Sequence, residues 1–481
     1  MSATVTPAMD VLLCGIDLGS TNLKVILVDG QAQTLWTKAI PVPRVMQGFG
    51  PVTDAMVLVE KLEQLVIEGW QAVGTKVPLT AISVTGVGED GLAVGRDLRP
   101  LDLAIPWFDR RAEQEARTLR ELTGDDIRAG LPIDYSRTAA KWSWLRANRA
   151  NAMREASFWI ALTDYPTVWW GQTPFMSQTL AARTACYDVF SRTWISGLLE
   201  ASGAPDLPKV VTAGTVIGTV ATGCLLKSGA ATQSTLLVAG GHDHPIAASA
   251  VRRLKQHAMI DSLGTANLVY DEVPALEPHG DPYVAFSVPA LGTPGVACLG
   301  VFEFAASIEP FRASDSGASL RAFLASSRAR GAPSALPDIR EAIDRAIRRQ
   351  TDIMGTADPQ QLRATLEAAC FYAKCMRQAI QKAGAAASPI YAVGGWARSD
   401  ALLQLRASIF GESVFAVEED ELTALGVALV ARDALGPSLI CEPFSRKSRV
   451  VQPVPEWQDA YERLHAGATR FISESKGAPA E

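Results

Sequence analysis

The chain has 481 residues, of which 48% are hydrophobic and 20% are charged, so it can form one or two large cores, and two domains fit this length best. Its formal net charge of −6 argues against a nucleic-acid binder, and no apolar stretch is long enough to cross a membrane. The seven cysteines include no C-x-x-C pair, and the N-terminus lacks the basic region of a secretory signal, so we expect a reduced, cytoplasmic protein.

The first half of the chain predicts strands that end in polar or glycine-rich turns. Two apolar runs, "VLLCGID" and "LKVILVDG", are joined by a tight Gly-Ser-Thr turn and predict two adjacent strands. The runs "LTAISVTGVG", "SFWIALTDY" and "STLLVAGGHD" predict further strands. In the second half, "PQQLRATLEAACFYAKCMRQAIQKAG" and "ELTALGVALVARDALG" predict helices between strands. This alternation is typical of α/β layers with parallel or mixed sheets.

The second half also contains an echo of the first. "GIDLGSTNLKVILVD" begins at Gly15 and "MIDSLGTANLVYDE" begins at Met259, and both contain Ile-Asp, a glycine beside a hydroxyl residue, and Asn-Leu. Chance can produce such a match because these residues are common in turns. We favour a duplicated domain, with one turn of each half facing a shared cleft. We place the two domains at residues 1–247 and 248–481.

The two glycine-hydroxyl turns are candidate phosphate sites, because such turns offer backbone N–H groups and hydroxyls to an anion. The first is formed by Gly19, Ser20, Thr21 and Asn22, with Lys24 nearby as a neutralising cation, and the second by Gly264 and Thr265. A plain hairpin turn is the alternative for either loop alone, and neither matches a P-loop or a G-x-G-x-x-G motif. Asp17 ends the first strand and is a candidate ligand for Mg²⁺, which prefers carboxylates combined with phosphate oxygens.

Two other stretches combine a strand with a glycine-rich turn. In "YAVGGWARSD", Gly394 and Gly395 would let an adenine or ribose approach the backbone, and Trp396 would stack on it. A turn capped by Ser399 or Asp400 is the equally supported alternative. In "GGHDHPIAA", His242, Asp243 and His244 raise three possibilities: a metal cage, a general base, or an ordinary polar loop. We favour Asp243 as a base at the end of a strand, where a carboxylate can take a proton from a substrate hydroxyl.

Taken in order, these segments resemble the FGGY family of carbohydrate kinases over essentially the whole chain. "GIDLGSTNLKVILVD" is similar to the family's first phosphate motif, "DSLGTANL" to its second, and "YAVGGWARSDALLQLRASIFG" with "TALGVALVA" to its adenosine motif. "LRPLDLAIPWFDRRA" resembles the sugar-domain segment with its Trp-x-Asp-x-Arg core, and "AAKWSWLRAN" resembles a Lys-Trp signature. "GGHD" occupies the place of the Gly-x-Asp that contains the family's base.

The resemblance implies the actin-like ATPase superfamily, in which two ribonuclease H-like α/β domains close on MgATP. It implies an ATP-dependent kinase that transfers the γ-phosphate to a hydroxyl of a ketose, such as a pentulose, or of a polyol, with ATP and Mg²⁺ as cofactors. Asp243 would be the base and would join Asp17 near the metal, while Ser399 would belong to the nucleotide site. The sugar site would contain Glu89, Asp90, Trp107, Asp109, His242 and His244.

The sequence departs from the family pattern at three places that concern ligands. "GVGEDG" places Glu89 and Asp90 where relatives vary, His244 follows the base in place of another polar residue, and Trp396 replaces a small residue. The substrate therefore cannot be copied from a named relative. A non-kinase ATPase of the same superfamily and a metal-dependent hydrolase using the two histidines are the alternatives. The resemblance is also compatible with a homodimer.

Overall fold

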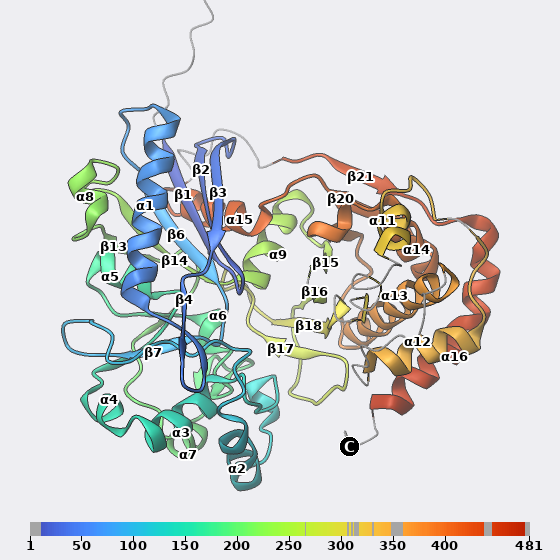
Figure 1. The fold of residues 1–481 in the computed structure, drawn as a ribbon, viewed down its shortest axis with the longest axis horizontal. Helices are drawn as coiled ribbons and strands as arrows, with labels where there is room; N and C mark the ends of the chain where they lie inside the picture. Colours follow the sequence, from blue (N-terminus) through green and yellow to red (C-terminus); the bar gives the residue numbers. More distant parts are fainter. Residues whose placement is uncertain are drawn as a thin grey trace, which may run out of the picture.

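The computed structural model describes residues 11–264, 266–304, 307–308, 311, 317–329, 331–347, 359–436 and 445–476. Two large sheets form its centre, and helices pack on both (Figure 1). The N-terminal half, coloured blue to green, contains a six-stranded sheet, and the C-terminal half, coloured yellow to red, contains a seven-stranded sheet. The predicted two-part α/β architecture is confirmed.

The first sheet combines antiparallel and parallel pairs. β1, β2 and β3 are antiparallel neighbours, whereas β1, β6 and β14 run parallel. β1 is buried along its whole length, which explains why its sequence is a continuous apolar run. The strand order is β13 (Val216–Thr219), β14 (Leu236–His242), β6 (Ala81–Gly86), β1 (Leu12–Leu18), β2 (Asn22–Asp29), β3 (Thr34–Pro41).

The second sheet repeats this topology. β15 and β16 form an antiparallel pair, β18 continues on one side, and β19 and β20 run parallel to β15 on the other. The strand order is β17 (Ala285–Ser287), β18 (Val296–Phe302), β16 (Asn267–Val273), β15 (Met259–Leu263), β19 (Ile390–Val393), β20 (Val414–Val417), β21 (Ser448–Val451). The echo in the sequence therefore corresponds to two equivalent hairpins, β1–β2 and β15–β16, in equivalent positions of the two sheets.

Helices cover both sheets. α1 (Ala55–Val73) packs on β2 and β3; Asp54 caps its first turn by accepting from the N–H groups of Met56 and Val57 at 2.9 and 3.2 Å. In the C-terminal half, α13 (Pro359–Lys382) packs on β16 and β18. The other helices of that half are α11 (Gly317–Leu324), α12 (Leu336–Ile347), α14 (Asp400–Phe410), α16 (Gln458–Lys476), and the 3₁₀ turns η2 (Gly395–Arg398) and η4 (Pro455–Trp457).

The two halves share a helical layer. α15 (Leu422–Asp433) belongs to the late part of the sequence, yet it packs on β1, β2, β6 and β14 and on α9 (Asp243–Leu254) (Figure 1). A Cβ at Gly15 of β1 would lie 2.1 Å from the carbonyl oxygen of Ala424, so this close approach requires glycine. The first sheet is thus covered on one face by a helix from the second half.

Shorter elements extend the N-terminal half away from its sheet. They include the two-stranded pairs β4 (Arg44–Gln47) with β5 (Gly50–Thr53), β7 (Gly91–Val94) with β8 (Phe158–Ala161), β9 (Met176–Ser177) with β12 (Val210–Val211), and β10 (Tyr187–Asp188) with β11 (Thr193–Trp194). The helices there are α2 (Glu113–Thr123), η1 (Ile127–Ala129), α3 (Thr138–Asn148), α4 (Ala150–Glu155), α5 (Tyr165–Gly171), α6 (Gln178–Ala181), α7 (Ser196–Ser202) and α8 (Cys224–Ser228). Within the described ranges, none of the helices is both long and apolar enough to traverse a bilayer.

Candidate functional site

The parallel strands β1, β6 and β14 bring their carboxyl ends to one edge of the first sheet. Asp17 of β1 pairs with Thr85 of β6, and Thr85 pairs on its other side with Gly241 of β14. The Thr85 hydroxyl donates to the Gly241 carbonyl at 2.7 Å. Asp17 and Asp243 therefore stand at the same edge, on either side of β6, where open α/β sheets bind ligands.

Asp243 begins a helix directly, where the sequence predicted a loop between strand and helix. β14 ends at His242 and α9 starts at Asp243. The predicted bend lies inside the strand, since the pairing with β6 shifts register between Val238 and Gly241. Gly241 has a φ of 149°, and a Cβ there would lie 2.2 Å from the Thr179 hydroxyl oxygen. Glycine thus allows a bulge that replaces the loop.

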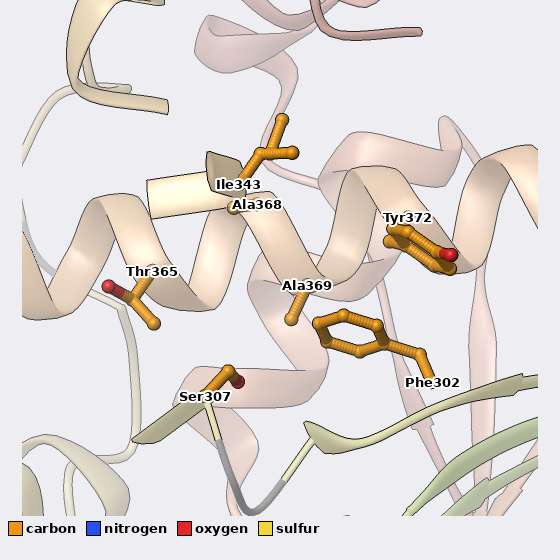
Figure 2. Close-up of a pocket in the computed structure, with 7 residues that line it drawn as sticks. All are labelled: Phe302, Ser307, Ile343, Thr365, Ala368, Ala369 and Tyr372. Atoms are coloured by element: carbon orange, nitrogen blue, oxygen red, sulfur yellow. The ribbon is translucent and has the colours of Figure 1, made fainter. Parts of the chain in front are cut away.

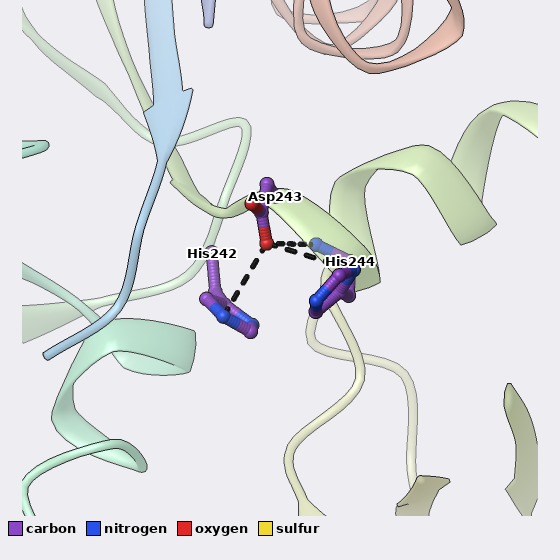
Figure 3. A group of neighbouring side chains, drawn as sticks. All are labelled: His242, Asp243 and His244. Atoms are coloured by element: carbon purple, nitrogen blue, oxygen red, sulfur yellow. Dashed lines mark hydrogen bonds and ion pairs between the residues drawn. The ribbon is translucent and has the colours of Figure 1, made fainter. Parts of the chain in front are cut away.

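Three neighbouring side chains gather around Asp243 Oδ1 (Figure 3). His242 Nε2 lies 3.3 Å and His244 Nδ1 lies 3.7 Å from this oxygen, and the backbone N–H of His244 donates to it at 2.7 Å. The Asp243 side chain is 23% exposed, so a ligand can reach it. His242 is buried, and burial lowers its pKa to about 3 even though the charge of Asp243 opposes this shift. The His242 imidazole is therefore neutral.

Asp17 is a buried carboxylate whose Oδ1 has no hydrogen-bond partner within the described residues. Burial, together with the charge of Asp243, raises its pKa to about 7, although Lys24 acts in the opposite direction. Lys24, which was predicted to neutralise phosphate, forms a 2.7 Å ion pair with Glu421. A bound cation would stabilise the ionised form of this buried carboxylate.

The first predicted phosphate loop is a hairpin turn between β1 and β2. The backbone N–H of Gly19 donates to the carbonyl of Asn22 at 3.0 Å and closes the turn. Ser20 is half-buried and Thr21 is exposed, so both reach solvent next to Asp17 in the sequence. The loop is therefore a hairpin turn, as the alternative stated. Anion binding by its hydroxyls stays a prediction.

The second predicted phosphate loop lies beside the predicted adenosine loop. Gly264 follows β15 and Gly394 follows β19, and these two strands are parallel neighbours. Gly394 has a φ of 92°, and a Cβ there would lie 2.6 Å from the carbonyl oxygen of Leu263, so the loops can touch only with glycine at this position. Gly394 and Gly395 are both exposed. Thr265 lies outside the described residues.

Asp261 is the counterpart of Asp17 in the second half, but its surroundings differ. Arg406 Nε lies 3.0 Å from Asp261 Oδ2, and both side chains are 1% exposed. The Asn267 amide donates to Asp261 Oδ1 at 2.7 Å. The protein therefore neutralises Asp261 internally, whereas Asp17 lacks such a partner among the described residues. Of the two duplicated carboxylates, Asp17 is the one suited to an external cation.

The predicted adenosine residues fall into two groups. Trp396 lies in η2, is partly buried, and its ring meets that of Phe304 edge to face at 5.5 Å between centroids. Ser399 caps α14, because its Oγ accepts from the N–H of Leu402 at 3.3 Å. The capping alternative for Ser399 is thus correct. Its hydroxyl is engaged by its own helix, while Trp396 keeps an exposed part.

A small apolar pocket lies elsewhere in the C-terminal half, between β18, α12 and α13 (Figure 2). The Ser307 hydroxyl donates to the carbonyl of Phe304 at 2.6 Å, and the Thr365 hydroxyl donates to that of Gln361 at 2.9 Å. The Ser307 and Thr365 hydroxyls of the lining are therefore already used. The pocket contains none of the predicted site residues, and its lining consists of Phe302, Ser307, Ile343, Thr365, Ala368, Ala369 and Tyr372.

Glu89 is held between two arginines. Arg137 Nη1 donates to Glu89 Oε1 at 2.7 Å, and Arg183 Nε donates to the same oxygen at 2.8 Å. Burial acts to raise the pKa of Glu89, but Arg183 and Arg137 outweigh it and hold that pKa well below its usual range. Glu89 is therefore ionised and fully paired. Its charge also acts on His242, which links this group to Asp243.

Asp90 is buried beside a cation that does not fully satisfy it. Lys141 Nζ lies 3.6 Å from Asp90 Oδ1 and donates to the carbonyls of Glu89 and Ile105, each at 3.0 Å. Burial raises the pKa of Asp90 to about 6, against the effect of Lys141. Oδ1 has no hydrogen-bond partner within the described residues. Lys141 pairs with this oxygen beyond hydrogen-bond distance, so its capacity to accept a hydrogen bond is unused within the described residues.

Asp109 and Trp107 complete the predicted acceptor region. Arg111 donates to both oxygens of Asp109 through Nε at 2.9 Å and Nη2 at 2.8 Å, and both side chains are 3% exposed. Asp109 thus orders the segment through a bidentate pair. Trp107 is 38% exposed. A backbone hydrogen bond from Trp107 acts on Asp90, so the two lie close together.

Sequence reasoning missed the cations that organise these carboxylates. Arg183 is 94 positions from Glu89, and no local spacing ties the two together. Arg44 lies 4.8 Å from the Phe108 ring centroid, and its charge acts on Asp90 from the β4–β5 hairpin. Lys141 stood inside the quoted Lys-Trp signature but received no role. The only available signal was that three acidic residues, Glu89, Asp90 and Asp109, cannot be buried together without cations.

Two domain models of one protein family match the two halves of the chain. The N-terminal domain model of the FGGY family of carbohydrate kinases matches residues 12–250, and the C-terminal domain model of that family matches residues 311–435. The chain belongs to this family. Like other FGGY kinases, it is an ATP-dependent kinase of a small sugar or polyol, and the non-kinase ATPase alternative is not favoured.

Curated FGGY relatives align over most of the chain. A xylulose kinase from Staphylococcus epidermidis is 22% identical over 491 residues, with 97% of each chain covered. A glycerol kinase from Alkalilimnicola ehrlichii is 26% identical over 497 residues, covering 94% of this chain and 98% of the relative. These relatives act on different acceptors, so identity at this level does not select one.

Solved structures share the fold of this FGGY kinase. The gluconate kinase from Lactobacillus acidophilus superposes with a TM-score of 0.82 at 18% identity, covering 97% of this chain and 98% of that one. The xylulose kinase from Rhodospirillum rubrum gives a TM-score of 0.81 at 18% identity, covering 96% and 98%. The predicted fold class is therefore confirmed.

Proposed function

We propose that Asp243 is the general base of this kinase and that the phosphoryl acceptor is a hydroxyl of a ketose or polyol. The observation that supports this role most directly is the position of Asp243. Its carboxylate is partly exposed at the carboxyl edge of β14, while buried His242 and half-exposed His244 approach the same oxygen. A base must lie within hydrogen-bond reach of the proton that it removes, and this edge offers such access.

The surroundings of Asp243 suit a carboxylate that accepts a proton only during the reaction. Asp243 is the first residue of α9, and the positive end of a helix dipole favours an ionised side chain there. Neutral His242 and the N–H of His244 orient Oδ1 without forming a strong ion pair. In the proposed step, Asp243 receives the acceptor hydroxyl proton as the hydroxyl oxygen bonds to the γ-phosphorus of ATP. The bond from that phosphorus to the β-phosphate oxygen breaks, and ADP leaves.

We propose that Asp17 holds Mg²⁺ together with the ATP phosphates, with Asp243 nearby. Support comes from the buried Asp17 Oδ1, which has no hydrogen-bond partner in the described part of the chain, and from the shortage of positive charge around it. These residues fit a hard cation that prefers one or two carboxylates and phosphate oxygens. When bound, the ion would neutralise charge on the phosphates. The chain itself supplies the carboxylates and the surrounding turn.

The nucleotide would lie between the two glycine-rich edges. On this proposal Gly19, Ser20, Thr21 and Asn22 contact phosphate from the first half, and Gly264 with Thr265 contacts it from the second. Lys24 would have to leave Glu421 to reach a phosphate. Gly394, Gly395 and Trp396 would contact the adenosine, supported by the exposure of the two glycines.

The acceptor would lie on the N-terminal side, against Asp90 and Trp107. Support comes from the buried Asp90 Oδ1, which has no hydrogen-bond partner among the described residues, and from the partly exposed indole of Trp107. Glu89 and Asp109 are already bound by arginines, so we assign them to shaping this wall rather than to direct contact. Xylulose and glycerol kinases among the relatives support a ketose or polyol.

A substrate panel tests this function. ADP release is measured with ATP and Mg²⁺ across ketoses, polyols and sugar acids. We expect one acceptor to give a turnover in the usual range of about 1–10³ s⁻¹. A flat response with every compound, together with appreciable basal ATP hydrolysis, would contradict the acceptor proposal. A sugar acid as the best acceptor would contradict the choice of ketose or polyol.

We also propose that the two domains divide near residue 247. The first sheet is built from strands between Leu12 and His242, and the second from strands between Met259 and Val451. The proposed boundary falls inside α9, which would make this helix the connection between domains. A homodimer remains a prediction from family resemblance, and light scattering coupled to size-exclusion chromatography tests it.

A further inference from the structure

The His242, Asp243 and His244 side chains place three potential metal ligands in one small volume. Each offers one ligand atom, and these atoms all lie within 4.8 Å of one another. His242 Nε2 is 3.3 Å and His244 Nδ1 is 3.7 Å from Asp243 Oδ1. In a tetrahedral zinc site with bonds of about 2.0–2.2 Å, neighbouring ligand atoms stand about 3.3–3.6 Å apart. The two separations from Asp243 Oδ1 are therefore near zinc geometry, and Figure 3 shows both imidazoles beside that oxygen.

We propose that these three residues form an exchangeable site for a zinc-class transition metal, and that binding there inhibits the kinase. Two imidazoles and one carboxylate suit Zn²⁺, whereas Mg²⁺ prefers oxygen ligands. The site is thus chemically distinct from the magnesium site proposed at Asp17. The inhibition rests on the proposed role of Asp243 as base, whereas the metal binding does not.

The surroundings of the cluster favour exchange over permanent occupancy. The His242 Nδ1 atom is buried and has no hydrogen-bond partner within the described residues. Ligating histidines are usually fixed by a partner on the other ring nitrogen, and loss of that partner typically costs about 10–100-fold in metal affinity. The His244 side chain is 39% exposed, so it can adjust by rotation and gives the metal a route from solvent.

Inhibition follows from which oxygen the metal would use. Asp243 Oδ1 is shared by both imidazoles, so the metal would bind the proposed base itself. The acceptor hydroxyl would then lose its proton acceptor while ATP binding persists.

Calorimetric titration with Zn²⁺ alone tests the binding, using full-length protein freed of any histidine tag, nucleotide and sugar. We expect one Zn²⁺ per chain for wild type, and His244→Ala should weaken binding by more than roughly tenfold. His257→Ala is the matched control, since His257 is an exposed histidine outside the cluster and should leave the affinity unchanged. Melting temperatures confirm folding, and His244→Asn replaces the first variant if that variant is unstable.

Equal Zn²⁺ affinity in wild type and His244→Ala would overturn the site, as would an equal loss of affinity in His257→Ala.

The kinase assay uses saturating MgATP, added Zn²⁺ and direct chromatographic detection of ADP, with each variant compared with its own metal-free rate. We expect Zn²⁺ to inhibit wild type and to inhibit His244→Ala at least roughly tenfold less potently. Site binding without inhibition would retain the metal site and contradict Asp243 as the base.

Discussion

Asp17 and Asp243 stand at the carboxyl ends of the two strands that flank β6, and the charge of Asp243 helps to raise the pKa of Asp17 to about 7. Two carboxylates at one sheet edge would repel each other without a cation between or beside them. Lys24 does not supply full compensation, because it pairs with Glu421. This relationship is why we assign one carboxylate to the metal and the other to proton transfer.

Asp243→Asn should reduce turnover by about 10²–10⁴-fold, because an amide cannot accept the hydroxyl proton. The fold and the affinity for ATP should remain close to wild type. Steady-state kinetics on the best acceptor and calorimetry with a non-hydrolysable ATP analogue measure both. Asp97→Asn, whose side chain is 67% exposed, is the matched control and should leave kcat unchanged. An Asp243→Asn enzyme with near wild-type kcat would disprove the base assignment.

Asp90→Ala should lower kcat/KM for the acceptor by roughly 10²-fold, because a charge-assisted hydrogen bond contributes about 1.5–3 kcal/mol. The affinity for ATP should barely move. The change also leaves Lys141 buried beside an empty position, so a lower melting temperature is expected and is measured first.

Asp90→Asn is the companion variant and should fall between wild type and alanine, since it keeps one acceptor oxygen. A kcat/KM of Asp90→Ala within about threefold of wild type would mean a loss well below 1.5–3 kcal/mol. The acceptor contact would then be assigned to the histidines beside Asp243.

Glu89→Gln should destabilise the protein by about 3–5 kcal/mol, because it leaves Arg137 and Arg183 without their buried anion. Urea unfolding measures this loss. Glu68→Gln is the matched control: Glu68 also forms a 2.7 Å ion pair, with Lys38, but its side chain is 51% exposed. Its loss should cost no more than about 1 kcal/mol. Similar costs for the two variants would show that the Glu89 pair is not structural.

Thr21→Ala should weaken ATP binding by about 0.5–1.5 kcal/mol, the net value of one hydrogen bond, while leaving the affinity for the acceptor unchanged. Calorimetry with each ligand separately makes the comparison. Thr173→Ala removes another exposed threonine away from this turn and serves as the control. Unchanged ATP affinity in Thr21→Ala would remove this hydroxyl from the phosphate site.

Asp164 gives a pH-dependent term in the free energy of unfolding. It is 1% exposed, and Ser177 donates to it through its N–H and its hydroxyl, each at 2.6 Å. Burial raises the pKa of Asp164 to about 7, although these bonds act to lower it. The folded state therefore binds this proton more tightly than the unfolded state, so the stabilisation is present at low pH and is lost between about pH 4 and pH 7.

Asp164→Asn removes this term. From about pH 4 to about pH 7 the wild type should lose stability relative to the variant, by up to about 1.4 kcal/mol per pH unit. Urea unfolding of both proteins at several values in this range measures the difference. A difference that stays constant with pH would contradict the raised pKa.

The sequence predicted those features that depend on a few neighbouring residues, such as strands and turns. The apolar run of β1, the Gly-Ser-Thr turn and the echo at Met259 predicted paired hairpins, because strand length and turn residues act over a few positions. It was also informative for Asp243, since a carboxylate after two glycines at a strand end is a local feature. The direct passage from β14 into α9 was not predicted, because a bulge depends on the neighbouring strand.

The electrostatic surroundings could not be predicted from local patterns. Glu89 and Asp90 are adjacent, yet two arginines donate to the first, while one oxygen of the second has no hydrogen-bond partner within the described residues. Which carboxylate is neutralised depends on distant segments such as the one containing Arg183. For the same reason the pairing of Asp261, the counterpart of Asp17, with Arg406 was not predicted.

The packing of α15 on β1 has a consequence for how the protein is made. α15 is synthesised late, so the face of the first sheet that it covers stays bare while most of the chain emerges from the ribosome. An N-terminal fragment that ends near residue 247 would keep that apolar face permanently and would tend to aggregate. Co-expressed with residues 248–481, it should become recoverable. The two halves repeat one topology, but as folding units they depend on each other.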